Sequence, residues 1–214
     1  MCIKVQTSFI RFLVDISGTP KPDKKSGNYQ KVIIANTSID RYNFDTVSDE
    51  FKEEFPSYWN KKGHKLQPHR LEEIVDFLNR KNIRMITVQF DVPDWEKYKA
   101  KYISEGHLEE KIMGILYYYV LKRVASKKHK YSALIDFDTQ FDIKESITIV
   151  QRIARERNYN FDINFGYIDI NPELKFPDWV ASAARKCTSD DLKKYKHFIM
   201  LKNFLPYYHI QRAF

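Results

Sequence analysis

The apolar residues of the chain fall into short runs that alternate between a strand-like and a helix-like period. The first run, residues 9–14, is interrupted only by Arg11, and a second run covers residues 30–34. Turn-forming residues bound both runs, so we predict two strands of a hairpin with a long loop. That loop, residues 17–28, is rich in Pro, Gly and Lys and is expected to be exposed and to face a substrate.

Helical and strand periods continue to alternate after the hairpin. Residues 68–79 are predicted to form a helix, because apolar side chains recur at helical spacing at Leu71, Ile74, Val75 and Leu78. This helix leads into a strand over 84–90, which is expected to be parallel. The same reasoning predicts a short helix near 49–58, a long helix over 105–126, a strand over 131–138, a helix over 144–157, a strand over 161–168 and a helix over 177–186. This order predicts one α/β domain over residues 1–214, with helices on the faces of its sheet.

Aspartates stand at the ends of several of these apolar segments. Asp15 closes the first strand, Asp136 and Asp138 close the strand that begins at Tyr131, and Asp178 opens the last helix. An unpaired carboxylate at the end of an apolar run is costly, so these positions indicate a functional site. Residues that alternate along a strand share a face, and the carboxyl ends of neighbouring strands meet at one edge. Carboxylates are the ligands that Mg²⁺ and Mn²⁺ prefer, so we predict a metal cluster.

Each of these aspartates also has a purely structural explanation. Asp15 could cap a turn together with Ser17, and Asp178 could favour the dipole of the helix that it begins. Asp138 could simply belong to a loop. The occurrence of the pattern in three separate segments favours the metal site over three unrelated explanations.

The chain is basic, with a net charge of +8 and a pI near 9.2, which favours a polyanionic partner such as nucleic acid. Basic and aromatic residues interleave around Tyr117–Arg123 and over 193–198, where Lys193, Lys194 and Lys196 are candidate contacts to a single strand. Core packing is the commoner origin of such aromatic strings. No apolar run approaches the roughly 18 residues of a membrane span, and no secretion signal is evident, so we expect a cytoplasmic protein with no membrane contact.

Three segments carry a resemblance to a known family: Asp15-Ile16-Ser17-Gly18, the strand that ends at Asp136, and residues 176–183 around Asp178. They resemble the ribonuclease H-like superfamily, and within it the uncharacterised family whose chains open with Asp-Glu-Ser-Gly and carry a helix starting Gln-x-Ala-Asp. In size and order the chain also resembles a small archaeal single-stranded-DNA exonuclease of that fold. Ile16 stands where the family usually has Glu, and Phe176-Pro177 replaces the usual Gln-x-Ala context.

The resemblance implies a ribonuclease H-like mixed sheet flanked by helices. It also implies a nuclease that hydrolyses phosphodiesters with Mg²⁺ or Mn²⁺ and acts on single-stranded DNA. Asp15, Asp136 and Asp178 would be the catalytic acids and metal ligands, with Asp138 as an auxiliary ligand. A fourth ligand could come from Glu109 or Glu110 in the long helix.

Other functions remain open on the sequence alone. Asp136-x-Asp138 is typical of nucleotide-sugar glycosyltransferases and, with Thr139, of haloacid-dehalogenase-type phosphatases. Pro93-Asp94 with Asp142-Ile143-Lys144 has the letters of a restriction-type nuclease. A non-catalytic nucleic-acid-binding protein would also explain the basic charge. The apolar tail 204–209 could dock on the domain or on a second subunit, which would make a homo-oligomer.

Overall fold

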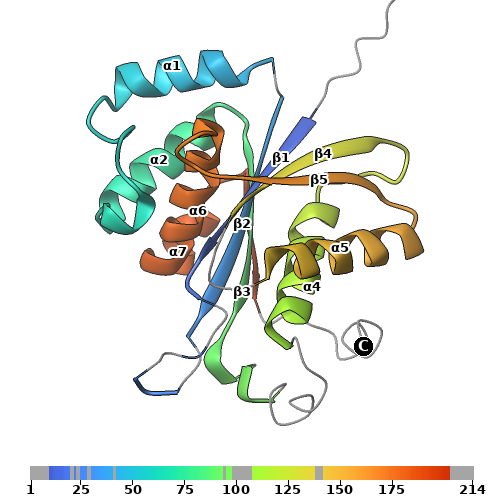
Figure 1. Ribbon diagram of the computed structural model, residues 1–214. Helices are drawn as coiled ribbons and strands as arrows, with labels where there is room; N and C mark the ends of the chain where they lie inside the picture. The colour runs from blue at the N-terminus through green and yellow to red at the C-terminus, as the bar shows by residue number, and fades with distance from the viewer. Residues whose placement is uncertain are drawn as a thin grey trace, which may run out of the picture.

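The structure of the protein, a computed structural model, describes residues 10–19, 22, 25–27, 30–40, 42–93, 95–97, 108–137 and 142–202. These residues form a six-stranded mixed sheet with the order β5-β4-β1-β2-β3-β6 (Figure 1). Its strands are β1 (Ile10–Ser17), β2 (Val32–Asp40), β3 (Arg84–Phe90), β4 (Lys130–Asp136), β5 (Asn160–Gly166) and β6 (Phe198–Lys202). Strand β2 is antiparallel to both of its neighbours, and the other pairings among the described strands are parallel.

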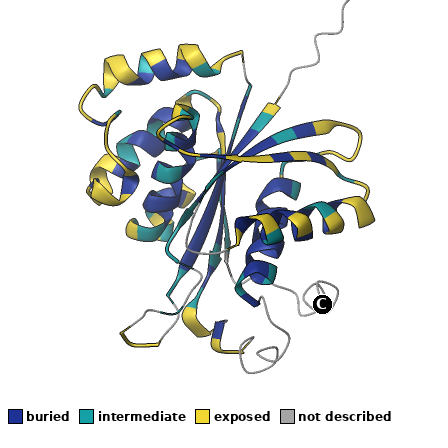
Figure 2. Ribbon diagram, in the orientation of Figure 1, coloured by how far each residue is buried: buried dark blue, intermediate teal, exposed yellow. Residues whose placement is uncertain are grey.

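Helices cover both faces of this sheet. One face carries α4 (Leu108–Lys122) and α5 (Ile143–Glu156). The other face carries α1 (Phe44–Glu54), α2 (Pro68–Arg80), α6 (Lys175–Lys186) and α7 (Ser189–Lys193), with the short 3₁₀ turns η1 (Gly63–Lys65) and η3 (Pro172–Leu174) (Figure 1). Because the central strands are covered twice, they are buried along most of their length (Figure 2).

Two hydrophobic cores lie on the two faces of the sheet, and the period of the strands assigns residues to them. Phe12 and Val14 pack under α4 and α5, whereas Leu13 packs under α6. On β4, Ala133 and Ile135 likewise pack under α4 and α5. The alternation predicted for the strand that begins at Tyr131 is therefore confirmed, and β1 alternates in the same way. This alternation determines which face receives the acids that follow.

Helix α4 is buried nearly all round, because it lies between the sheet and α5. Tyr117, Tyr118 and Tyr119 are each at most 3% exposed. Burial raises the pKa of Tyr118 to about 12. The interpretation of these tyrosines as a stacking surface for nucleic acid is therefore wrong, and core packing explains them.

Helices α4 and α5 approach most closely at Gly114, which gives a first prediction. A Cβ on this residue would lie 2.8 Å from Cβ of Ile149 and 2.8 Å from the carbonyl oxygen of Ser146. We expect Gly114→Ala to lower the free energy of unfolding by about 1–3 kcal/mol, because the overpacking cost exceeds the helix propensity gained. Urea unfolding measures this difference. Thr148→Ala on the exposed side of α5 is the control, and a Gly114→Ala protein as stable as this control would contradict the close packing.

The structure differs from the predicted elements in several places. Strand β2 continues to Asp40 and not only to residue 34, and helix α7 was not predicted. Strand β6 was not predicted, because its five residues follow a basic string and form only an edge strand beside β3. Helix α1 begins at Phe44 and not near 49, since buried side chains recur from Val47 to Phe51. Strand β3 was expected to be parallel, but it pairs antiparallel with β2 and parallel only with β6.

Several sequence predictions fall outside the described residues, namely those on Asp138, on Asp94 and on the tail 204–209. Cys187 is a free thiol. Among the helices that the structure describes, none combines the length and the apolar character needed to cross a membrane.

Candidate functional site

Strands β1 and β4 place two of the predicted acids side by side. Their parallel register pairs Val14 with Ile135, and one step further along both strands are Asp15 and Asp136. Val14 and Ile135 point toward α4 and α5, so the two aspartates that follow them lie on the α6 face. Asp15 is only 6% exposed, and Asp136 is half-buried. The carboxyl ends of neighbouring strands therefore bring these two carboxylates to one edge, as predicted.

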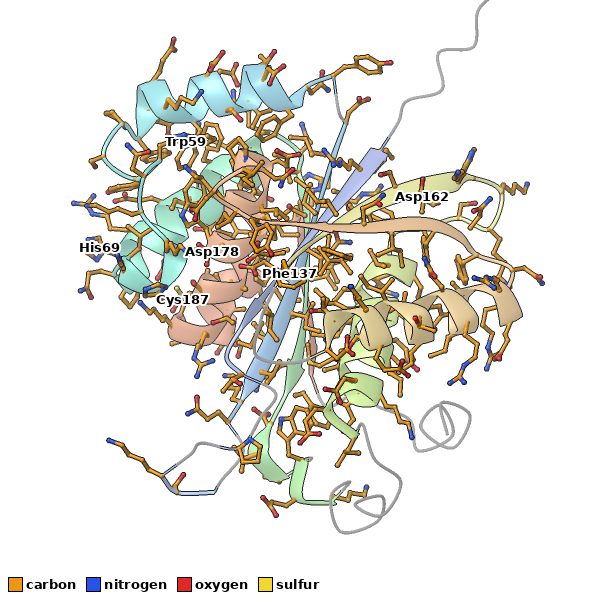
Figure 3. All side chains as sticks on the ribbon, in the orientation of Figure 1. Trp59, His69, Phe137, Asp162, Asp178 and Cys187 are labelled. Carbon is orange, nitrogen blue, oxygen red and sulfur yellow. The ribbon has the colours of Figure 1, made fainter. Side chains whose placement is uncertain are left out.

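The third acid, Asp178, approaches the same edge from α6. This helix packs across β1 and β2, and Figure 3 shows Asp178 on it, on the side of the sheet away from α5. A cleft of about 500 Å³ is lined by all three aspartates. The other residues that line it are Ile16, Ser17, Gly18, Thr19, Gln30, Lys62, His64, Phe137, Ile168 and Ser182.

Backbone amides orient two of the three carboxylates. The N–H of Ile168 donates to Oδ1 of Asp136 at 3.0 Å, and the N–H of Gly63 donates to Oδ2 of Asp178 at 2.8 Å. Ile168 follows β5, and Gly63 begins η1, so each acid is held by an element far from it in the sequence. Both hydrogen bonds stabilise the ionised form of the carboxylate.

The pKa of Asp178 is raised above its ordinary value, because burial disfavours its charge. The Gly63 N–H, His64 and Lys62 act in the opposite direction and partly offset this burial. His64 and Lys62 are exposed at the mouth of the cleft. They lie in a stretch without apolar periodicity, so sequence patterns did not single them out. The available signal was the basic run Lys61-Lys62-Gly63-His64-Lys65 around a glycine.

The described side chains of the cleft are of the kind that binds a divalent metal ion, but their present arrangement does not form a three-ligand site. Asp15 and Asp136, at the ends of neighbouring strands, supply carboxylate oxygens, which Mg²⁺ and Mn²⁺ prefer. Asp178 is directed to the amide of Gly63. In the part of the chain that the structure describes, no three His, Cys, Asp or Glu side chains are grouped closely enough to hold a metal ion.

The two glutamates proposed as a fourth ligand, Glu109 and Glu110, are not among the described residues that line the cleft. Oε1 of Glu110 accepts a hydrogen bond of 3.3 Å from the amide of Asp142 at the start of α5. Asp142 caps this helix, with Oδ1 accepting from the amides of Lys144 and Glu145. The letters Asp142-Ile143-Lys144 are therefore a helix cap and not the strand motif of a restriction-type nuclease.

The lysines predicted to contact nucleic acid are not in the described lining of this cleft. Nζ of Lys193 lies 3.3 Å from Oδ1 of Asp190, and Nζ of Lys194 lies 3.6 Å from Oε2 of Glu72. Lys193, Lys194 and Lys196 are exposed at and after α7. Their contact with nucleic acid stays a prediction.

No protein-family model and no curated protein sequence matches the chain. Solved structures that are similar to it in fold include two of Bst-RNase HIII. A mutant of Bst-RNase HIII gives a TM-score of 0.54 at 11% sequence identity. Bst-RNase HIII in complex with Mn²⁺ gives a TM-score of 0.51 at 10% identity. Each comparison covers 87% of this chain and 54% of the other, so the chain spans about half the length of these structures.

The fold is ribonuclease H-like, as the sequence resemblance implied. The mixed six-stranded sheet and its flanking helices belong to the part of this chain that the fold comparison covers. At this level of identity the likeness concerns the fold alone.

The turn that holds Asp178 has no space for a side chain at Gly63, which gives a second prediction. A Cβ there would lie 2.4 Å from Oγ of Ser182 and 2.8 Å from the carbonyl oxygen of Asp178. We expect Gly63→Ala to displace η1 from α6 and to lower the free energy of unfolding by about 1–3 kcal/mol. Chemical unfolding of Gly63→Ala and of the double variant with Ser182→Gly measures this cost. The double variant is expected to regain part of the lost stability, because the close contact with the Ser182 side chain is removed. Losses in stability that are strictly additive for the two substitutions would contradict the packing of Gly63 against Ser182.

Proposed function

We propose that this protein is a divalent-metal-dependent nuclease, which hydrolyses phosphodiester bonds of nucleic acid with Mg²⁺ or Mn²⁺. Asp15 and Asp136 would flank the metal, Asp178 would be a third ligand and Asp138 an auxiliary acid. The observation that carries the proposal is the convergence of Asp15, Asp136 and Asp178 on one cleft at the carboxyl edge of a ribonuclease H-like sheet. Structural explanations that treat each acid separately do not account for this convergence.

The chemistry expected of the site follows from its residues. Divalent ions, when bound, would neutralise the charge that develops on the attacking and leaving oxygens. The chain itself holds Asp136 through the amide of Ile168 and Asp178 through that of Gly63. Lys62 at the mouth of the cleft offers positive charge to a phosphate that approaches these acids, and His64 beside it offers a hydrogen-bond donor. The net charge of +8 favours the approach of a polyanion in general.

The finer assignments depend on the sequence resemblance. We infer single-stranded DNA as the substrate and cleavage from an end, because the order Asp15, Asp136 and Asp178 resembles a small archaeal exonuclease of this fold. The resemblance to the Asp-Glu-Ser-Gly family and the cytoplasmic location belong to the same proposal. The similar solved structure was determined with Mn²⁺, which supports Mn²⁺ as one of the ions to test.

A cleavage assay tests this function. Purified protein is incubated with end-labelled single-stranded and duplex DNA and RNA, in Mn²⁺, Mg²⁺ or EDTA, with Asp15→Asn in parallel. We expect products that require a metal ion and disappear in the variant, and the labelled end will identify the direction of cleavage. Absence of cleavage with every substrate and ion would refute the proposed enzyme.

One observation favours a second candidate, a nucleic-acid-binding protein without catalysis. Asp136 and Asp178 both accept backbone hydrogen bonds, and the described side chains include no ready three-ligand metal group. In that case Asp15→Asn changes little. Lys194→Ala and Lys196→Ala would instead reduce both the affinity and its salt dependence, since phosphate contacts release counterions.

A further inference from the structure

Three aromatic side chains cluster at the carboxyl edge of the sheet, beside the cleft. The ring centroids of Phe137 and Tyr167 are 5.0 Å apart, and those of Phe137 and Phe165 are 5.3 Å apart. Phe165 is 42% exposed and Tyr167 is 49% exposed. We refer to Phe137, Phe165 and Tyr167 as the aromatic platform.

The position of the platform is not explained by the hydrophobic core. Along β5, Phe161 and Ile163 are buried under α5, whereas Phe165 stands on the same side of the strand but is exposed. Of the three rings, Phe137 packs partly against that core. Figure 3 labels it near the middle of the view, where the strands cross. Contiguous exposed apolar surface is unusual in a soluble chain unless something binds to it.

The platform is continuous with the carboxylate cleft. Phe137 directly follows Asp136 in the chain, and Phe137 and Ile168 both line the cleft. The amide of Phe137 donates to the carbonyl oxygen of Gly166 at 2.7 Å, which fixes the end of β4 to the end of β5. Phe165 stands on the face of the sheet that carries α5, whereas Asp136 lies on the α6 face, so a polymer whose backbone passes the acids reaches these rings around the end of β4, where Phe137 lines the cleft.

A second hollow adjoins the cleft and carries cations. Its volume is about 290 Å³, and it shares Lys62 and Ile168 with the cleft. Lys61 and Lys175 also line it, with Asn60, Asp169 and Pro172. The amino group of Lys175 donates to the carbonyl oxygen of Trp59 at 2.8 Å, so this cation is held in a fixed place. Positive charge on this hollow and exposed rings on the platform match the two parts of a nucleotide, its phosphate and its base.

We propose that the aromatic platform stacks the unpaired bases of a nucleic-acid strand whose phosphates lie over the carboxylate cleft and the hollow of Lys61, Lys62 and Lys175. This inference rests on the proposed function and narrows its substrate to strands with unstacked bases. Aromatic side chains bind single strands by stacking because every base has a π face, whereas the bases of a duplex are already stacked on one another. The platform thus gives a physical reason for a preference that otherwise depends on resemblance alone.

Binding in EDTA tests the platform without cleavage. Fluorescence anisotropy compares a labelled oligothymidylate with an abasic strand of the same length, for the wild-type protein and for Phe165→Ala/Tyr167→Ala. We expect the double variant to bind oligothymidylate about 10-fold more weakly, which corresponds to the loss of one stacked base. It is expected to bind the abasic strand with the affinity of the wild type. Phe165→Trp/Tyr167→Phe is expected to retain the affinity, because both rings remain.

Tyr42 provides a matched control. This tyrosine is 72% exposed and follows β2, whose end is paired with the start of β1, at the opposite edge of the sheet from the cleft. Tyr42→Ala is expected to leave both affinities unchanged. Equal binding of the two strands by the wild-type protein, or an equal loss for both strands in the double variant, would overturn the platform; so would absence of binding by the wild type.

The experiments can refute the platform and the proposed function independently of each other. If the wild type cleaves nucleic acid but the platform variants bind oligothymidylate normally, the nuclease stands and the platform is refuted. If the platform variants lose affinity for bases but the wild type cleaves nothing, the platform stands and the nuclease is refuted.

Discussion

Replacement of Asp136 by asparagine is expected to reduce metal-dependent cleavage about a thousandfold while the protein stays folded. The asparagine Oδ1 can still accept the hydrogen bond from the Ile168 amide, so the end of β4 keeps its position. The charge that would hold the metal is lost, and with it several kcal/mol of transition-state stabilisation, which corresponds to this rate factor. Affinity for nucleic acid is expected to stay the same or to increase, because one source of repulsion toward phosphate is removed.

A matched acid on the neighbouring strand serves as the control for this variant. Asp162 lies on β5, exposed, with its Oδ2 3.8 Å from Nζ of Lys130, and Figure 3 shows it far along the strand from the sheet edge that carries Phe137. Exposed ion pairs of this kind contribute little to stability. Asp162→Asn is expected to cleave as the wild type does. Comparable losses in Asp136→Asn and Asp162→Asn, measured as initial rates in Mn²⁺, would refute a specific role for Asp136.

Replacement of Asp178 by asparagine is expected to reduce cleavage and at the same time to stabilise the fold. Burial raises the pKa of Asp178, so the fold disfavours the charged form of this carboxylate. Asparagine removes this charge and can still accept the Gly63 amide. We expect an increase of about 0.5–2 kcal/mol in the free energy of unfolding at pH 7, the usual range for a stabilising substitution.

The pH dependence of stability gives this prediction a second readout. The folded pKa of Asp178 lies above its unfolded value, so the folded state binds the proton more tightly. The stability that protonated Asp178 contributes is therefore present below the unfolded pKa, near 3.8, and is lost as the pH rises through the folded pKa. Thermal unfolding over this pH window should show a smaller decline for Asp178→Asn than for the wild type. An Asp178→Asn protein less stable than the wild type at pH 7 would contradict the cost of the buried charge.

The sequence was sufficient to predict most of the sheet and the convergence of the acids, for a physical reason. Strands covered on both faces read as apolar runs, and the period of two residues assigned Asp136 and Asp138 to one face of their strand. The carboxyl-edge rule then placed Asp15 beside Asp136. Asp178 was found from its position at the start of α6, in a motif that resembles a known family.

Other parts of the site depend on tertiary contacts that no local pattern carries. Lys62, His64 and the amide of Gly63 reach the cleft only because η1 packs on α6. The aromatic platform requires the register of β4 with β5, which brings Phe137 next to Phe165. Short apolar strings such as the three tyrosines of α4 are equally compatible with a surface and with a core, and only the packing of α5 over them decides.

Manganese binding tests the central claim most directly, because it does not depend on the choice of substrate. Electron paramagnetic resonance of free Mn²⁺ during a titration reports the ion taken up by the wild type, by Asp15→Asn/Asp136→Asn and by the Asp162→Asn control. We expect uptake by the wild type and by the control, and its loss in the double variant. Equal uptake by all three proteins, or none by the wild type, would contradict a metal site at the edge shared by β1 and β4.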